Sequence, residues 1–161
     1  MLKGIIDTEA KQSVKPLYTY IYTGLMFLLY AGFALLDSYR IHRGESWLSK
    51  KNLTQEEFQR IDHLGIWQGR IEWVFLSLFL VAAALAIVRY RIKNDGFPLK
   101  RFLLVHLCLF ILLLAFSYTF SVVSPSPLGN VIQPLLEAIL LFGIMMLYPL
   151  YRMLMKRQRN N

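Results

Sequence analysis

The stretch "NVIQPLLEAILLFGIMMLYPLY", residues 130–151, decides the fold of this chain. After a short polar start it is apolar on every side of a helical projection, except at Glu137. About 20 apolar residues at a rise of ~1.5 Å each cross a hydrocarbon core of roughly 30 Å. A helix of a water-soluble protein would present a polar face, which this stretch lacks. Residues 131–151 are therefore expected to span a membrane.

Three other stretches share this character: residues 17–36, 71–90 and 102–123. Hydrophobic residues make up 56% of the 161-residue chain and charged residues only 17%, whereas soluble domains are roughly 45–50% apolar. Short connections between consecutive spans favour an up-and-down arrangement. The sequence therefore predicts an all-α integral membrane protein, a single membrane domain (residues 1–161) formed by an antiparallel bundle of four transmembrane helices.

Basic residues are unevenly distributed among the connections between these spans. Residues 91–101 and the tail after residue 151 are rich in Lys and Arg, whereas residues 124–130 carry no charge. Cytoplasmic loops carry an excess of Lys and Arg. We therefore expect both termini and the inner loop 91–101 in the cytoplasm, and the outer loop 37–70 and the outer turn 124–130 outside. Compact size and short loops favour a bacterial plasma membrane.

The net charge of +8 could indicate a nucleic-acid partner, but its distribution does not. Twelve of the 18 Lys and Arg residues lie on the expected cytoplasmic side, while the outer side carries six basic and six acidic residues. A basic inner surface attracts anionic lipid headgroups. We therefore expect anionic lipids at the cytoplasmic face, and no nucleic acid, as partners.

The outer loop 37–70 contains a helix-start signature, Thr54 followed three residues later by Glu57. Apolar residues then recur every third position up to Trp67. This pattern predicts an amphipathic helix that lies on the outer membrane surface between the first two spans. A bend at Gly65 or Gly69 is expected to turn the chain into the second span.

Six polar residues are expected to line a cleft that opens outward: Tyr30, Ser77, Ser117, Asn130, Gln133 and Glu137. Counting about six residues inward along each span brings four of them to one depth, roughly 9 Å inside the outer boundary. The other two, Asn130 and Gln133, share a helical face with Glu137 by their spacing. Three residues are expected at the rim of this cleft: His63, Arg70 and Glu72.

Glu137 has two interpretations, which the sequence leaves open. An acid at the centre of a span costs about 2.5–3.5 kcal/mol, and such residues are often functional. Glu137 could carry a proton or bind a ligand, or it could form an interhelical hydrogen bond that fixes the packing.

Other chemistry has little support in the sequence. Cys108 is the only cysteine, which excludes an intrachain disulfide and a cysteine-based metal site. His106 has no second histidine at matching depth, as paired ligation of a haem would need. The common nucleotide-binding, zinc-protease and hydrolase motifs are absent from the sequence. We therefore expect no metal and no cofactor, and we assign no enzymatic activity.

One segment resembles a known family slightly. The stretch "EFQRIDHLGIW" (residues 57–67) is similar to the histidine-bearing segment of bacterial intramolecular lipoprotein acyltransferases, which also combine four spans with an outer first loop. Those enzymes use a further histidine in the second outer loop, where this chain has "SPSPLGN" (residues 124–130). No site residue is carried over from that family.

Three functions follow from these observations. The first is an accessory, regulatory or immunity-type subunit that acts on a protein partner, or on a second copy of itself, through its helices and outer loop. The alternative is a small transporter or ligand-binding membrane protein that uses the outward-facing cleft at Glu137. A second alternative is an outer-leaflet enzyme that modifies a lipid or a lipoprotein.

Overall fold

The computed structural model describes residues 2–48, 54–93 and 97–159. These residues form four helices, in chain order α1 (Leu2–Leu48), α2 (Gln55–Lys93), α3 (Phe97–Val123) and α4 (Leu128–Arg159). Side chains are described at residues 18–46, 54–92 and 99–147 and at two positions near the C-terminal end of α4.

Each helix contains a segment long and apolar enough to cross a membrane: Tyr18–Ser46, Gln55–Ile92, Leu99–Val123 and Leu128–Leu147. The prediction of an all-α chain with four apolar helices of spanning length is therefore confirmed. All four segments exceed the ~17 residues that a membrane crossing requires at minimum.

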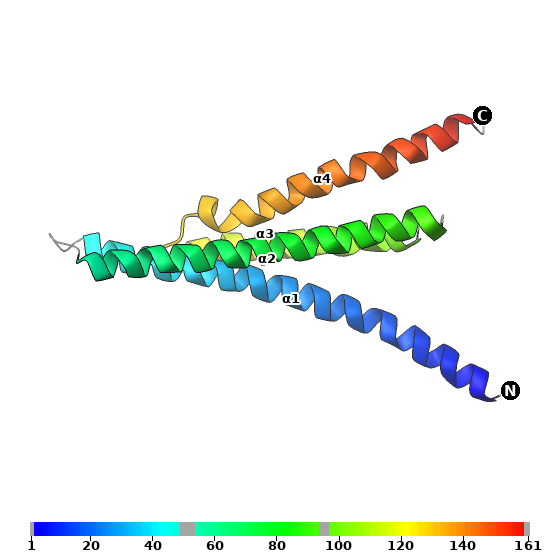
Figure 1. Cartoon of the computed structure of the whole chain (residues 1–161), viewed down its shortest axis with the longest axis horizontal. Helices are drawn as coiled ribbons and strands as arrows, with labels where there is room; N and C mark the ends of the chain where they lie inside the picture. The colour runs from blue at the N-terminus through cyan, green and yellow to red at the C-terminus, as the bar shows by residue number, and fades with distance from the viewer. Residues whose placement is uncertain (1, 49–53, 94–96, 160–161) are drawn as a thin grey trace.

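The helices lie along one long axis, and each helix contacts the other three. Both termini lie at the same end of the molecule, and α1 and α2 meet at the opposite end (Figure 1). The N-terminal part of α1 and the C-terminal part of α4 diverge from α2 and α3 (Figure 1). At the opposite end, α1 and α2 reach well beyond the turn that joins α3 to α4 (Figure 1).

The expected outer loop 37–70 is largely helical. α1 continues to Leu48 and α2 begins at Gln55, while residues 49–53 of this loop lie outside the described residues. The segment expected to form a separate surface helix is instead the first part of α2, and Figure 1 shows no sharp bend between the two. We name residues 37–48 of α1 and 55–70 of α2 the outer hairpin.

Packing explains why α2 does not break at its glycines. A glycine inside a helix costs roughly 0.5–1 kcal/mol relative to alanine. Gly65 faces the Arg40 guanidinium of α1, and Gln68 donates a hydrogen bond to Asp37 of α1. Contacts with α1 therefore support the helix across the region where the sequence predicted a bend.

The predicted start of α2 is confirmed in atomic detail. The Thr54 amide donates to the Glu57 carboxylate over 3.1 Å, and the Glu57 amide donates to the Thr54 hydroxyl over 3.4 Å. This reciprocal pair satisfies backbone donors that the first turn of a helix leaves open.

The two short connections are tighter than the sequence predicted. Helix α3 ends at Val123 and α4 begins at Leu128, so four residues, 124–127, join them. The Pro127 carbonyl accepts hydrogen bonds from the amides of Asn130 and Val131, which starts α4. At the end of the molecule that holds the termini, α2 continues to Lys93 and α3 begins at Phe97, so both helices extend into the expected inner loop 91–101. Residues 94–96 of this loop lie outside the described residues.

The core is formed by one stripe of buried residues from each helix at a spacing of three or four. The stripes are Met26, Tyr30 and Ala34 of α1, Phe75, Leu76 and Phe79 of α2, Leu109, Phe110 and Leu113 of α3, and Val131, Leu135 and Ala138 of α4. Residues at this spacing share one helical face. The remaining faces carry many exposed large apolar side chains on all four helices.

Candidate functional site

The Tyr30 hydroxyl connects three helices inside the core. It donates a hydrogen bond of 2.8 Å to the Val131 carbonyl of α4, and it lies 2.6 Å from the Ser117 hydroxyl of α3. The Ser117 hydroxyl also donates to the Leu113 carbonyl of its own helix over 2.7 Å, so the two hydroxyls distribute two hydrogens among three contacts. Two of the residues predicted to share one depth, Tyr30 and Ser117, therefore meet.

A second polar group lies in the outer hairpin, centred on the fully buried Asp37. Its Oδ1 accepts a hydrogen bond from Gln68 Nε2 of α2 over 3.1 Å and another from Arg40 Nη2 over 3.3 Å. Arg40 is the cation of this ion pair and is partly exposed. Asp37 is therefore a buried carboxylate that joins α1 to α2, although it stands in the expected outer loop 37–70.

Glu72 of α2 and Glu137 of α4 are within range of an electrostatic interaction between their carboxylates. Glu137 is half-buried, and its Oε1 accepts a hydrogen bond of 3.3 Å from Gln133 on the same helix. The predicted cleft residue Glu137 and the predicted rim residue Glu72 thus interact electrostatically, and both are half-buried.

Four buried side-chain atoms accept or donate no hydrogen bond among the described residues: Asp37 Oδ2, Gln68 Oε1, Glu72 Oε1 and Ser126 Oγ. Three of them are pure acceptors, and two belong to carboxylates. Buried polar atoms are nearly always paired, so each such atom calls for a specific explanation. These atoms therefore represent hydrogen-bonding capacity that no described group of the chain uses.

Of the remaining residues predicted to line the cleft, Gln133 is exposed and contacts this region through its hydrogen bond to Glu137. Ser77 is exposed, and Asn130 is half-buried. At the rim, the guanidinium of Arg70 lies 4.9 Å above the ring of Trp67. His63 is exposed and lines a pocket of the outer hairpin.

His106 forms a separate polar contact in the other half of the bundle. Its Nδ1 lies 2.9 Å from the Phe102 carbonyl, which can only accept, so this nitrogen carries the hydrogen. Its Nε2 lies 2.8 Å from the Tyr22 hydroxyl and accepts from it in the neutral ring. Both ring nitrogens are occupied by these contacts, which leaves neither available as a metal ligand.

Asp37 and Gln68 are the site residues that the sequence reasoning missed. A signal for them existed in the spacing of the core stripes. Asp37 follows Tyr30 by seven residues, and Gln68 precedes Phe75 by seven, so each continues a buried stripe by two turns. The stripe, rather than the end of the apolar run, marks which residues face the neighbouring helix.

The carboxylates of this region do not form a metal centre. Among the described residues, no group of three or more His, Cys, Asp or Glu side chains is placed to hold a metal ion. The chemistry that the geometry does offer is the acceptance of hydrogen bonds in a buried, partly anionic setting. Comparison of the chain with models of protein families, with curated proteins and with solved structures found no match.

Proposed function

We propose that the chain is a multi-pass protein of a bacterial plasma membrane, an antiparallel four-helix bundle with both termini in the cytoplasm. Four helices of spanning length and apolarity support this proposal. The basic loop 91–101 and the basic C-terminal tail support the orientation. The two termini also lie at one end of the molecule (Figure 1). In this threading the outer hairpin faces the extracytoplasmic side.

The proposed role is that of an accessory, regulatory or immunity-type subunit, which binds a protein partner or a second copy through the outer hairpin. The observation that carries this role is the projection of the hairpin beyond the turn between α3 and α4 (Figure 1). Its surface includes exposed aromatic side chains at Tyr39, Phe58 and Trp67. Aromatic residues on a rigid element are frequent anchors of protein interfaces.

A photoreactive phenylalanine analogue tests this role in intact membranes. Placed at Phe58 in the outer hairpin, it is expected to give one discrete protein adduct after irradiation. Leu140 in the middle of α4 provides a matched control, because the two side chains are equally exposed, at 66% each. Leu140 is expected to give lipid adducts only. Equal protein adducts from both positions, or none from Phe58, would contradict the proposed role.

Ligand binding is a second candidate function, favoured by the unpaired acceptors near Asp37 and Glu72. We propose that they receive a ligand with positively charged N–H donors, such as a primary ammonium group. Each of the two carboxylates has a buried oxygen without a hydrogen bond among the described residues, and the ion pair with Arg40 engages only the other oxygen of Asp37. A buried carboxylate is stabilised by an opposite charge together with hydrogen bonds. In this proposal the centre of binding shifts from Glu137 to Asp37 and Glu72, with Glu137 beside them.

A comparison of two cations of equal charge distinguishes ligand binding at Asp37 and Glu72 from a general effect of salt. Methylammonium carries N–H donors, whereas tetramethylammonium carries none. At equal ionic strength, methylammonium is expected to raise the melting temperature of the purified chain in detergent more than tetramethylammonium does, because a ligand stabilises the state that binds it.

Single substitutions test whether the difference between the two cations arises at Asp37 and Glu72. Asp37→Asn and Glu72→Gln should each remove the difference between the two cations. Asp62→Asn, at an exposed position of the same hairpin, should retain it. Equal shifts for both cations in the wild type would exclude ligand binding through N–H donors.

A further inference from the structure

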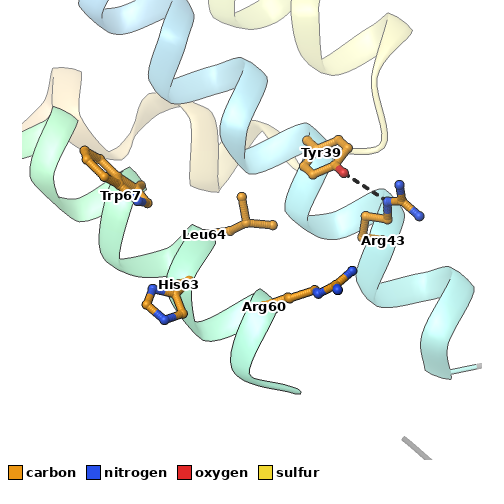
Figure 2. A pocket seen from close by; sticks show the side chains of 6 residues that line it. All are labelled: Tyr39, Arg43, Arg60, His63, Leu64 and Trp67. Carbon is orange, nitrogen blue, oxygen red and sulfur yellow. Dashed lines mark hydrogen bonds between the residues drawn. The ribbon is translucent and has the colours of Figure 1, made fainter. Parts of the chain in front are cut away.

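The outer hairpin contains a pocket between its two helices. Its volume is about 380 Å³. Six side chains line it: Tyr39 and Arg43 of α1, and Arg60, His63, Leu64 and Trp67 of α2. Figure 2 shows Arg60 reaching from α2 toward α1, and Arg43 beside Tyr39 on the facing helix.

The lining of this pocket is positively charged. Two guanidinium groups and an imidazole face it, and no carboxylate is among the six lining side chains. The hairpin is nevertheless rich in acids, since Glu56, Glu57 and Asp62 lie within a few residues of Arg60. Glu56 and Glu57 precede Arg60 by four and three residues and so share its side of the helix, yet neither lines the pocket, whose lining stays basic.

Both arginines have guanidinium nitrogens that are available to an anion. Arg43 Nε donates a hydrogen bond of 3.1 Å to the Tyr39 hydroxyl, and its guanidinium lies 5.4 Å above the Tyr39 ring. This contact occupies Nε and leaves the two terminal nitrogens of Arg43 for another acceptor. Arg60 makes no hydrogen bond or ion pair with the described residues. Guanidinium groups recognise phosphate oxygens through paired N–H donors.

The lining also includes two large apolar side chains, Leu64 and Trp67. A ligand that suits both the basic and the apolar lining has an anionic head and an apolar body. Trp67 precedes the apolar run that begins at residue 71 by only four residues, or ~6 Å of helix, which places the apolar part of the pocket at the depth of lipid headgroups in the proposed threading. Aromatic side chains concentrate at this depth.

We propose that this pocket binds the phosphate of an anionic outer-leaflet phospholipid, with Arg43 and Arg60 on the phosphate oxygens and Leu64 and Trp67 against the glycerol and upper acyl chain. The lipid as the source of the phosphate rests on the proposed membrane threading. The pocket is distinct from the acceptor group at Asp37 and Glu72, which suits ligands of the opposite charge.

Titration of the purified full chain in detergent tests the proposal, with native mass spectrometry as the readout. The three probes are a short-chain phosphatidylglycerol, the matching phosphatidylcholine and inorganic phosphate. Saturable binding of the phosphatidylglycerol is expected, at least tenfold tighter than that of the phosphatidylcholine. Loss of one charged hydrogen-bonding group weakens binding by roughly 10- to 100-fold. Arg60→Gln and Arg43→Gln should show that loss.

Arg89→Gln is the matched control: it removes the same charge from an exposed position near the other end of α2, where it can affect only the weak attraction of anionic lipid to the basic end and not the tight binding in the pocket. It should bind like the wild type. If Arg60→Gln and Arg89→Gln weaken the binding of phosphatidylglycerol equally, the proposal is wrong, and the lipid is attracted only by the overall positive charge of the chain. Inorganic phosphate binding as tightly as the lipid would overturn the lipid as occupant. If the pocket binds the lipid but the threading proves to be reversed, the proposed orientation is refuted and the lipid site is not. A failure of the lipid site and a failure of the proposed threading can therefore be told apart.

Discussion

Tyr30 shows how a polar group is accommodated in the apolar core of this protein. Its hydroxyl is fully surrounded by α1, α3 and α4, where an unpaired hydroxyl would be costly. The contacts with Ser117 and the Val131 carbonyl remove that cost and join three helices at one point. A single hydroxyl thus contributes to the alignment of the bundle.

Replacing this hydroxyl gives the first prediction. Tyr30→Phe keeps the ring and its packing against Phe75 but loses both hydrogen bonds. Interhelical hydrogen bonds of membrane proteins contribute about 0.6 kcal/mol on average and up to ~1.7 kcal/mol. A decrease of that size in the free energy of unfolding is expected from titration of the detergent-solubilised protein with a denaturing detergent.

Tyr118→Phe is the control for this measurement, because Tyr118 is 65% exposed on the outer face of α3. Its effect should stay within about 0.5 kcal/mol. A Tyr30→Phe variant as stable as Tyr118→Phe would show that the hydroxyl network does not align the helices.

Sequence reasoning grouped these side chains by depth, which gives no direction. Tyr30 and Ser117, two members of that group, meet in the core. Ser77 was placed in the same group, yet it lies two residues from the buried Phe75 and Phe79 and therefore points to the opposite side of α2. The depth of a residue gives its position along the helix. The direction of its side chain depends on helix packing, which one sequence does not reveal.

At the scale of elements, α2 departs most from its expected form. It is one helix of 39 residues, roughly 58 Å long at ~1.5 Å per residue. The sequence predicted the capping pair at Thr54 and the apolar run from residue 71, and both are present. The continuity between them could not be predicted, because it depends on the contact of Gln68 with Asp37 of α1.

The continuity of α2 gives a second prediction. Gly69 lies inside the helix, and an added methyl group would meet no atom within 4 Å. Gly69→Ala is therefore expected to stabilise the protein by about 0.5–1 kcal/mol, since alanine loses less backbone entropy on folding. Thermal unfolding in detergent measures the change.

Gly65→Ala is a useful comparison, because its methyl group would touch the Arg40 guanidinium at 3.5 Å. A smaller gain is expected there. Destabilisation by Gly69→Ala would instead indicate that α2 bends at this glycine, as the sequence alone suggested.

At the scale of the whole molecule, the two ends of the bundle differ in chemistry. One end holds both termini (Figure 1) and most of the Lys and Arg residues. The other end holds the outer hairpin, with the acceptor group at Asp37 and the basic pocket between Arg43 and Arg60. The proposed functions all place the second end outside the cytoplasm, so the threading is the claim on which they depend.

Cysteine labelling of intact cells tests this threading most directly. In a Cys108→Ser background, single cysteines are introduced at two exposed positions, Gln59→Cys in the outer hairpin and Lys100→Cys at the start of α3. A membrane-impermeant maleimide should label the cysteine at position 59 in intact cells. It should label the one at position 100 only after permeabilisation. The reverse pattern would contradict the proposed orientation, and labelling of both positions in intact cells would contradict the membrane threading itself.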